Sequence, residues 1–236
     1  MPQQIRWFEP RFDDEEIKEV EKVIRDNYVN EGPKTRELEE LFRNYFGVKY
    51  AVLTVNATAA LFLAIKSEAK KRNVKDFEVI IPDMTMIATA TAVDWAGGKP
   101  VMVDVKKENL TIDTDKVEEK ITPLTIAILP VHVLGRSADM DKIKKIAKKY
   151  NLIVIEDAAG ALGSLNNGKL LGTIGDVGCF SLQSNKIITS GQGGVLLTND
   201  DSLFELIRRY RDFGRLSNCL LYTSDAADDL LCVDLG

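Results

Sequence analysis

Seven short apolar runs rich in β-branched residues recur along the chain, and most of them are separated by segments with helical periodicity. The runs do not alternate apolar with polar residues, which is typical of strands that helices cover on both faces. This order of strands and helices favours an α/β layer architecture. The predicted strands are Ala51–Val55, Val79–Pro82, Pro100–Val105, Ile126–Val131, Leu152–Glu156, Gly178–Leu182 and Gly194–Leu197.

Helical periodicity is clearest between residues 138 and 150, where Met140, Ile143 and Ile146 share one face and lysines occupy the other. Two amphipathic segments precede the first strand and are separated by Gly32-Pro33, a pair that interrupts helices. The predicted helices are Asp13–Tyr28, Lys34–Phe46, Ala59–Lys71, Met84–Ala96, Asp115–Lys120 and Ala138–Tyr150.

The last two predicted strands are joined by a glycine-containing segment, residues 183–193, that is too short for a crossover helix. Such a connection predicts an antiparallel pair, whereas strands separated by helices pair in parallel. The sequence therefore predicts a three-layer α/β/α domain, with a mainly parallel seven-stranded sheet and one antiparallel strand.

Composition and charge exclude several classes of protein. A net charge of −5 and a pI near 5.2, without a basic stripe, argue against a nucleic-acid-binding protein. No apolar run approaches the ~20 residues of a membrane helix, and the N-terminus lacks the apolar core of a signal peptide. Three cysteines without disulfide or metal-ligand spacing indicate a reduced, cytoplasmic setting, and a single histidine rules out a multi-histidine metal site.

Residues 219–236 depart from the pattern of the preceding chain. They contain four aspartates and no lysine or arginine, and they supply most of the net negative charge. The string Cys219–Ala227 resembles translated adapter sequence from DNA sequencing. We interpret residues 218–236 as an atypical tail that is not native sequence; the alternative is a genuine acidic C-terminal segment.

Two segments together predict a pyridoxal 5'-phosphate (PLP) site. The apolar run 153–155 ends in Glu156 and Asp157, and a later strand leads through Ser181 to Lys186. In such a site a lysine amine holds the cofactor as a Schiff base, an acid pairs with the pyridinium nitrogen, and a serine binds phosphate. Taken alone, Lys186 would be a surface lysine, and Asp157 would be a helix cap or part of an ion pair.

A third segment, Val55–Leu61, runs from a strand end into a helix through small residues. Backbone N–H groups at a helix N-terminus attract anions, so Ala57 and Thr58 are candidate ligands of the cofactor phosphate. Capping of the helix by Asn56 or Thr58 is the structural alternative. His132 ends another strand at the same edge of the sheet as Asp157. Two roles are open for His132: contact with the cofactor or substrate, or that of a hydrogen-bonded structural histidine. Glu156, one residue before Asp157, is expected to point to the opposite side of the strand.

Residues 7–217 resemble the DegT/DnrJ family of PLP-dependent sugar aminotransferases, which have the aspartate aminotransferase fold (fold type I). The resemblance implies that Lys186 is the Schiff-base lysine, that Asp157 is the pyridinium partner, and that Ser181, Ala57 and Thr58 hold the phosphate. Met86 stands where an aromatic residue usually stacks on the PLP ring, and a methionine thioether can also cover a ring. The landmarks of the resemblance are Gly32-Pro33, Asn56–Ala59, Pro82–Met86, Pro130–Gly135, Glu156–Ala159, Gly163-Ser164 and Phe180–Gly194.

The resemblance also implies a domain organisation and an assembly. Residues 1–50 would form a helical segment packing on a PLP-binding large domain at residues 51–217, and the family's small C-terminal domain would be missing. Members form homodimers with active sites at the subunit interface. Gly160 departs from the family, since many members carry Gln or Glu at this position.

The resemblance implies an aminotransferase that moves an amino group from glutamate to a nucleotide-linked keto-sugar in amino-sugar or polysaccharide biosynthesis. A sugar dehydratase on the same scaffold is one alternative, although those relatives place histidine at the position of Lys186. A PLP-binding or sensory protein without turnover is the other.

Overall fold

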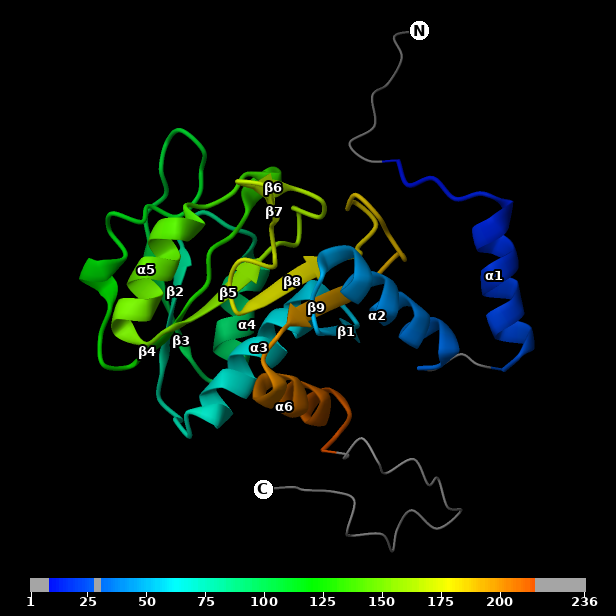
Figure 1. Cartoon of the computed structure of the whole chain (residues 1–236), viewed down its shortest axis with the longest axis horizontal. Helices are drawn as coiled ribbons and strands as arrows, with labels where there is room; N and C mark the ends of the chain where they lie inside the picture. The colour runs from blue at the N-terminus through cyan, green and yellow to red at the C-terminus, as the bar shows by residue number, and fades with distance from the viewer. Residues whose placement is uncertain (1–8, 28–30, 215–236) are drawn as a thin grey trace, which may run out of the picture.

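The computed structural model describes residues 9–27 and 31–214. Its centre is a seven-stranded sheet with the strand order β1-β9-β8-β5-β4-β2-β3 (Figure 1). All seven strands predicted from the sequence are present, with ends shifted by at most three residues. They are β1 (Tyr50–Thr54), β2 (Glu78–Pro82), β3 (Lys99–Val103), β4 (Thr125–Ile128), β5 (Ile153–Asp157), β8 (Val177–Ser181) and β9 (Gly194–Thr198).

Strand β9 runs antiparallel to both of its neighbours, β1 and β8, and every other pair in this sheet is parallel. The short connection between β8 and β9 imposes this reversal, because a parallel return would need a crossover of a dozen or more residues. The predicted mainly parallel sheet with one antiparallel strand is therefore confirmed.

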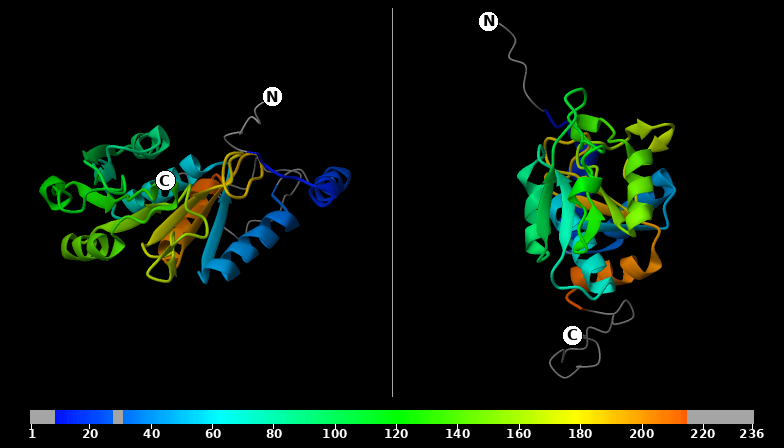
Figure 2. Two further views of the ribbon diagram at one scale, coloured as in Figure 1. Left: turned by 90° about the horizontal axis from the view of Figure 1, so that it is seen from above. Right: turned by 90° about the vertical axis from the view of Figure 1, so that its left-hand side faces the viewer.

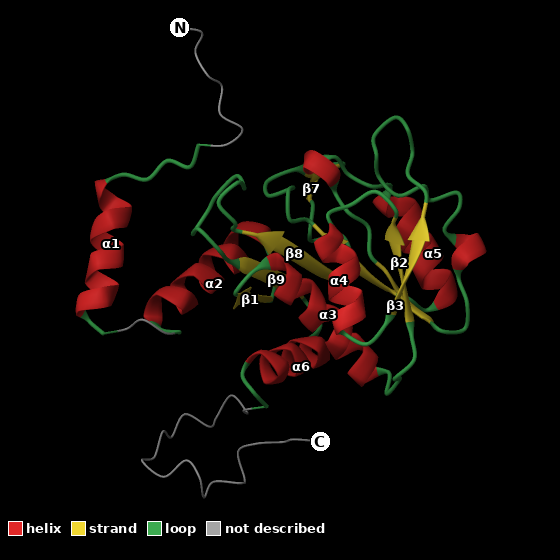
Figure 3. Ribbon diagram, turned by 180° about the vertical axis from the view of Figure 1, so that it is seen from behind, coloured by secondary structure: helices red, strands yellow, loops and turns green. Residues whose placement is uncertain are grey.

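Helices cover both faces of the sheet and make a three-layer α/β/α arrangement. Figure 3 shows α3, α4 and α6 in front of the sheet, and Figure 2 shows the layers from two further directions. Within the described residues, no helix is long and apolar enough to cross a membrane. The helices are α1 (Asp14–Arg25), α2 (Pro33–Phe46), α3 (Ala57–Lys71), α4 (Ile87–Trp95), α5 (Met140–Tyr150) and α6 (Asp201–Arg211), with two 3-10 turns at Glu118–Lys120 and Val133–Gly135.

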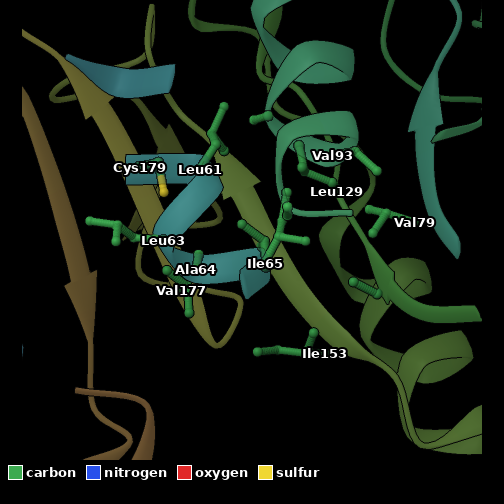
Figure 4. Packing of buried hydrophobic residues seen from close by; sticks show 14 of the residues in the cluster. Leu61, Leu63, Ala64, Ile65, Val79, Val93, Leu129, Ile153, Val177 and Cys179 are labelled. Atoms are coloured by element: carbon green, nitrogen blue, oxygen red, sulfur yellow. The ribbon is translucent and has the colours of Figure 1, made fainter. Parts of the chain in front are cut away.

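The core consists of two hydrophobic clusters, one on each face of the sheet. Alternate side chains of a strand point to opposite faces, so Ile81 and Ile155 pack with α3 and α4, whereas Ile80 and Val154 pack with α5. Burial on both faces explains why these strands lack polar alternation. Figure 4 shows the first cluster, in which α3 contributes Leu61, Leu63, Ala64 and Ile65 beside Val79, Val93, Leu129, Ile153, Val177 and Cys179.

The two N-terminal helices differ in how they meet the sheet. Helix α2 packs beside β1 and buries Phe42 and Phe46, and Phe46 lies 4.9 Å from Phe180 between ring centroids. Helix α1 buries none of its residues, and Figure 1 shows it to one side of the other elements. The domain boundary at residue 50 stays a prediction, and the atypical tail at residues 218–236 lies outside the described residues.

Three local assignments differ from the sequence prediction. The helix expected at Asp115–Lys120 is wrong: only Glu118–Lys120 form a single 3-10 turn, because a segment this short nucleates poorly and Pro123 disfavours helical backbone at the residue before it. The hairpin β6 (Leu165–Asn166) and β7 (Lys169–Leu170) was not predicted, although Asn167-Gly168 is a strong hairpin signal. Helix α6 was not predicted either.

Helix α6 begins at an N-cap formed by Asp200. Its carboxylate accepts hydrogen bonds from Leu203 N at 3.0 Å and Ser202 Oγ at 2.6 Å, and it pairs with Lys71 Nζ at 2.7 Å. Partial burial raises the pKa of this carboxyl, but the bonds to Lys71, Ser202 and Leu203 outweigh it and lower the pKa to about 2. The carboxylate thus stabilises the folded chain in its ionised form.

Replacing this cap, Asp200→Ala, should lower the free energy of unfolding by about 1 kcal/mol at pH 7. A lowered folded-state pKa gives stability above the unfolded value of 3.8 that is lost as the pH falls toward about 2. Urea unfolding at pH 7 and at pH 3 should therefore show a smaller difference between variant and wild type at the lower pH. Glu205→Ala, which removes an exposed acid from the next turn of the same helix, is the control and should cost less. Equal unfolding of Asp200→Ala and wild type at pH 7 would contradict this assignment.

Candidate active site

Asp157 is the last residue of β5 and is 5% exposed. Its Oδ2 accepts a hydrogen bond from Thr89 Oγ1 at 2.8 Å, and its Oδ1 accepts one from Ala159 N at 3.1 Å. Among the described residues it caps no helix and makes no ion pair, so neither structural alternative accounts for it. Burial raises the pKa of this carboxyl, and the hydrogen bonds from Thr89 and Ala159 and the charge of Lys186 oppose that rise.

The strand register brings Ser181 beside the start of α3. Ser181 of β8 pairs with Gly194 of β9, and Gly194 pairs in turn with Thr54 of β1. Three residues after Thr54, at Ala57, α3 begins. Every second residue of β5 and of β8 packs in the cluster that contains α3, and Asp157 and Ser181 are the next residues in these two series. Their side chains therefore belong to the same face of the sheet.

Gly194 touches the first turn of α3. A Cβ at this position would lie 2.4 Å from Asn56 C and O and 2.6 Å from Ala57 N, closer than carbon atoms can approach backbone. Only glycine therefore allows β9 and the N-terminus of α3 to lie this close. The contact places the strand pair Ser181–Gly194 beside the start of α3.

The N-terminus of α3 has two N–H groups directed out of the helix. Asn56 is the N-cap, and its side chain accepts a hydrogen bond from Ala59 N at 2.8 Å, while its carbonyl accepts one from Ala60 N. The amides of Ala57 and Thr58 precede the first intrahelical bond. With the positive end of the helix dipole behind them, they can bind an anion. Capping and anion binding thus use different N–H groups here.

Lys186 lies in the turn that follows β8 and is half-buried. Its amide donates to Gln183 O at 2.9 Å, and the loop returns to the sheet through a bond from Leu182 N to Gly193 O at 2.9 Å. The ammonium is near enough to Asp157 to lower the pKa of that carboxyl. The structure thus brings the predicted lysine and the predicted acid, 29 positions apart in the chain, into one neighbourhood.

Both ring nitrogens of His132 form hydrogen bonds within the protein. Its Nδ1 accepts a hydrogen bond from Ala138 N at 3.3 Å, so its Nε2 donates to Glu156 Oε2 at 2.8 Å. Glu156 is fully buried on the face opposite Asp157, as expected. It also accepts three backbone bonds from the loop after β7, from Gly172, Ile174 and Gly175. This pair therefore fixes two loops behind the site. Both ring nitrogens of His132 have protein partners, as expected of a structural histidine, and its contact with a cofactor or substrate stays a prediction.

Met86 is 72% exposed and is the last residue before α4, three positions before Thr89. The described contacts do not place its thioether over Asp157, so its role as cover for a ring stays a prediction. A Cβ at Gly160 would meet no atom within 4 Å, so a larger side chain would have room there.

Two site residues escaped the sequence interpretation. A buried threonine on an apolar helix gives no signal of its own, and Thr89 is identified only through its bond to Asp157. Gly194 was noted within a glycine-rich loop, but its contact with Ala57 depends on the register across three strands.

Comparisons with known proteins agree with the fold. Residues 10–224 match the DegT/DnrJ/EryC1/StrS aminotransferase family. A GDP-perosamine synthase of Caulobacter vibrioides is 42% identical over 206 residues, 87% of this chain and 55% of that protein. The chain spans about half the length of the curated relatives it matches. It therefore belongs to the DegT/DnrJ/EryC1/StrS aminotransferase family.

Solved structures show the same architecture. DesI, determined in the presence of its TDP-sugar product, superposes with a TM-score of 0.80 at 35% identity, over 87% of this chain and 52% of that one. A GDP-4-keto-6-deoxymannose-3-dehydratase with a trapped PLP-glutamate geminal diamine superposes with a TM-score of 0.84 at 29% identity, over 90% of this chain and 56% of that one.

Burial of Asp157 has a consequence for stability that can be measured without a ligand. A folded-state pKa raised above 3.8 favours folding below that pH, and this contribution is lost as the pH rises through the folded pKa. Asp157→Asn should therefore raise the free energy of unfolding of the cofactor-free chain at pH 7. The gain is about 1.4 kcal/mol for each unit by which the folded pKa exceeds the unfolded value.

Chemical unfolding at pH 7 and pH 4 measures this effect, which should be smaller at the lower pH. Asp94→Asn, at an exposed position on α4, is the matched control and should leave stability unchanged. A loss of stability in Asp157→Asn at pH 7 would contradict the claim that ionisation of the buried Asp157 destabilises the folded chain.

Proposed function

We propose that this protein binds PLP and transfers an amino group from glutamate to a nucleotide-linked keto-sugar. One observation carries the proposal. The segments that carry Lys186, the buried carboxylate of Asp157 and the first amides of α3 lie at or after the carboxyl ends of β8, β5 and β1, which lie at the same edge of the sheet. Each has a structural explanation alone, but together they match the three functional groups of the cofactor.

The residues present fit PLP. The Ala57 and Thr58 amides and the Ser181 hydroxyl offer donors to a phosphate, and the missing side chain at Gly194 keeps them close together. Asp157 has one hydrogen bond to each oxygen, from Thr89 and Ala159. A carboxylate oxygen has further acceptor capacity, so it can also accept from a pyridinium N–H.

When bound, the cofactor supplies an electron sink for the negative charge that develops at the substrate α-carbon. The Lys186 amine would hold the cofactor covalently, and as a free amine it would accept the proton of the amino donor's α-carbon. Asp157 would keep the ring nitrogen protonated. The α3 amides would hold the phosphate.

The proposed substrate class rests on the relatives. Proteins named GDP-perosamine synthase and DesI with a TDP-sugar product are 42% and 35% identical to this chain. We also propose a cytoplasmic homodimer, in which residues 51–217 form the cofactor-binding domain and active sites lie at the interface. Large exposed apolar side chains beside the site, Val55, Met86 and Ile87, support an interface there.

A sugar dehydratase is the second candidate, because a 3-dehydratase superposes on this chain with a TM-score of 0.84. Lys186 favours the aminotransferase, since dehydratases of this scaffold are expected to carry histidine at that position. Product analysis with glutamate and a panel of nucleotide-linked keto-sugars separates the two, because only the aminotransferase leaves nitrogen on the sugar.

Lys186→Ala should abolish the covalent cofactor link. Borohydride reduction of the PLP-loaded wild type, followed by peptide mass spectrometry, should place the cofactor on Lys186, and the variant should show none. Lys169→Ala, at an exposed lysine of the β6–β7 hairpin, is the control and should keep the full yield. A reducible link that persists on another lysine of Lys186→Ala would overturn the assignment.

Asp157→Asn should keep the cofactor bound but slow removal of the glutamate α-proton by about 10- to 100-fold, the effect expected for losing one charge-assisted hydrogen bond. An amide cannot hold the ring nitrogen protonated, so the loss should fall on kcat rather than on glutamate binding. Exchange of the α-proton in D2O, followed by NMR, measures the step. A variant that exchanges at the wild-type rate would mean that another group is the pyridinium partner.

A further inference from the structure

Two threonine hydroxyls from the start of α4 form a chain that ends on Asp157. Thr89 is fully buried, and its Oγ1 lies 2.8 Å from Asp157 Oδ2. The same Oγ1 lies 2.8 Å from Oγ1 of Thr85, which is half-buried in the turn before the helix. Neither threonine is among the cofactor ligands predicted from the sequence.

The direction of the chain follows from donor counting. An ionised carboxylate only accepts hydrogen bonds, and a hydroxyl has a single proton to donate. Thr89 therefore donates to Asp157, and its oxygen accepts the proton of Thr85. Both O–H dipoles point toward the carboxylate, an arrangement that favours its charged form.

We propose that Thr89, with its hydroxyl oriented by Thr85, is a positioning residue that keeps Asp157 ionised and aimed at the ring nitrogen of the cofactor. This inference rests on the proposed function, in which Asp157 is the pyridinium partner.

The proton shared by Asp157 and the ring nitrogen can lie on either atom. The useful arrangement is a carboxylate beside a pyridinium, because only the protonated ring is a strong electron sink. Burial favours the opposite arrangement, a neutral acid beside a neutral ring, since it disfavours charge. A hydrogen bond donated to Asp157 stabilises its anion and returns the proton to the ring.

The other groups around Asp157 do not replace Thr89. Lys186 acts on the carboxyl through its charge alone and lowers its pKa less than the Thr89 hydroxyl does. His132 Nε2 bonds to Glu156 and not to Asp157. Cys179, opposite Asp157 in the strand register, and Glu156 give it no hydrogen bond. Ala159 N bonds the other oxygen. Thr89 is thus the one side-chain donor to Asp157 in the described part of the chain.

The helix itself gives no reason for a threonine at position 89. Threonine is a weaker helix former than alanine or leucine, and a buried hydroxyl needs a partner. Valine has the same shape without that need, so the hydroxyl is explained by the carboxylate it contacts.

The test compares Thr89→Val with Thr89→Ser and Thr198→Val. Thr89→Ser keeps the hydroxyl, and Thr198→Val removes a buried threonine hydroxyl that donates to Asp176 O instead. Two readouts are used besides activity. Carbon-13 NMR of the Asp157 carboxyl gives its titration in the cofactor-free chain, and nitrogen-15 NMR of ring-labelled PLP reports protonation of the ring nitrogen.

Thr89→Val should raise the pKa of Asp157, move the ring nitrogen signal toward the unprotonated position, and slow α-proton exchange about tenfold. Thr89→Ser should restore all three, and Thr198→Val should change none. Thr85→Val should act in the same direction with a smaller effect, which keeps the test informative if Thr89→Val fails to fold.

Unchanged Asp157 titration and ring nitrogen signal in a folded Thr89→Val would overturn the inference. If the proposed function is wrong, the wild type itself will bind no PLP. The carbon-13 titration needs no cofactor, so it still decides whether Thr89 controls the ionisation of Asp157.

Discussion

The contact between Gly194 and the first turn of α3 is the constraint on which the rest of the site depends. Because β9 reverses direction between β8 and β1, the starting residue of β9 lies level with the end of both neighbours. A glycine there lets the backbone of α3 approach to a distance that any side chain would prevent. The reversed strand thus places the Ser181 hydroxyl beside the helix amides, and the lysine loop that precedes β9 is held over the same edge.

Strand β5 ends in two buried carboxylates with different roles. Glu156 faces the α5 side, where His132 and three backbone amides satisfy it and lock two loops in place. Asp157 faces the α3 and α4 side with one bond to each oxygen. The first carboxylate has its hydrogen bonds supplied by the protein and stabilises the fold. Asp157 can accept further hydrogen bonds although it is buried. Its burial lowers the stability of the folded chain, and its free acceptor capacity suits a protonated group of a ligand.

The sequence was sufficient for the strands of the main sheet. Unbroken apolar runs identified every strand of the main sheet, and the length of the 183–193 connection predicted the antiparallel strand. The remaining features depend on contacts between distant segments. Thr89 is 68 residues from Asp157 in the chain, and His132 meets Glu156 only because β4 and β5 are neighbours. The error at Asp115–Lys120 is of another kind, since this short charged segment has helical composition but only one apolar residue, Val117, to bury.

The most direct test of the central claim, that these segments form one cofactor site, is a crystal structure of the chain with PLP. The account predicts the phosphate within hydrogen-bond distance of the Ala57 and Thr58 amides and the Ser181 hydroxyl, with the ring nitrogen against Asp157 and the link on Lys186. A phosphate bound elsewhere, or a ring nitrogen that faces a group other than Asp157, would contradict it.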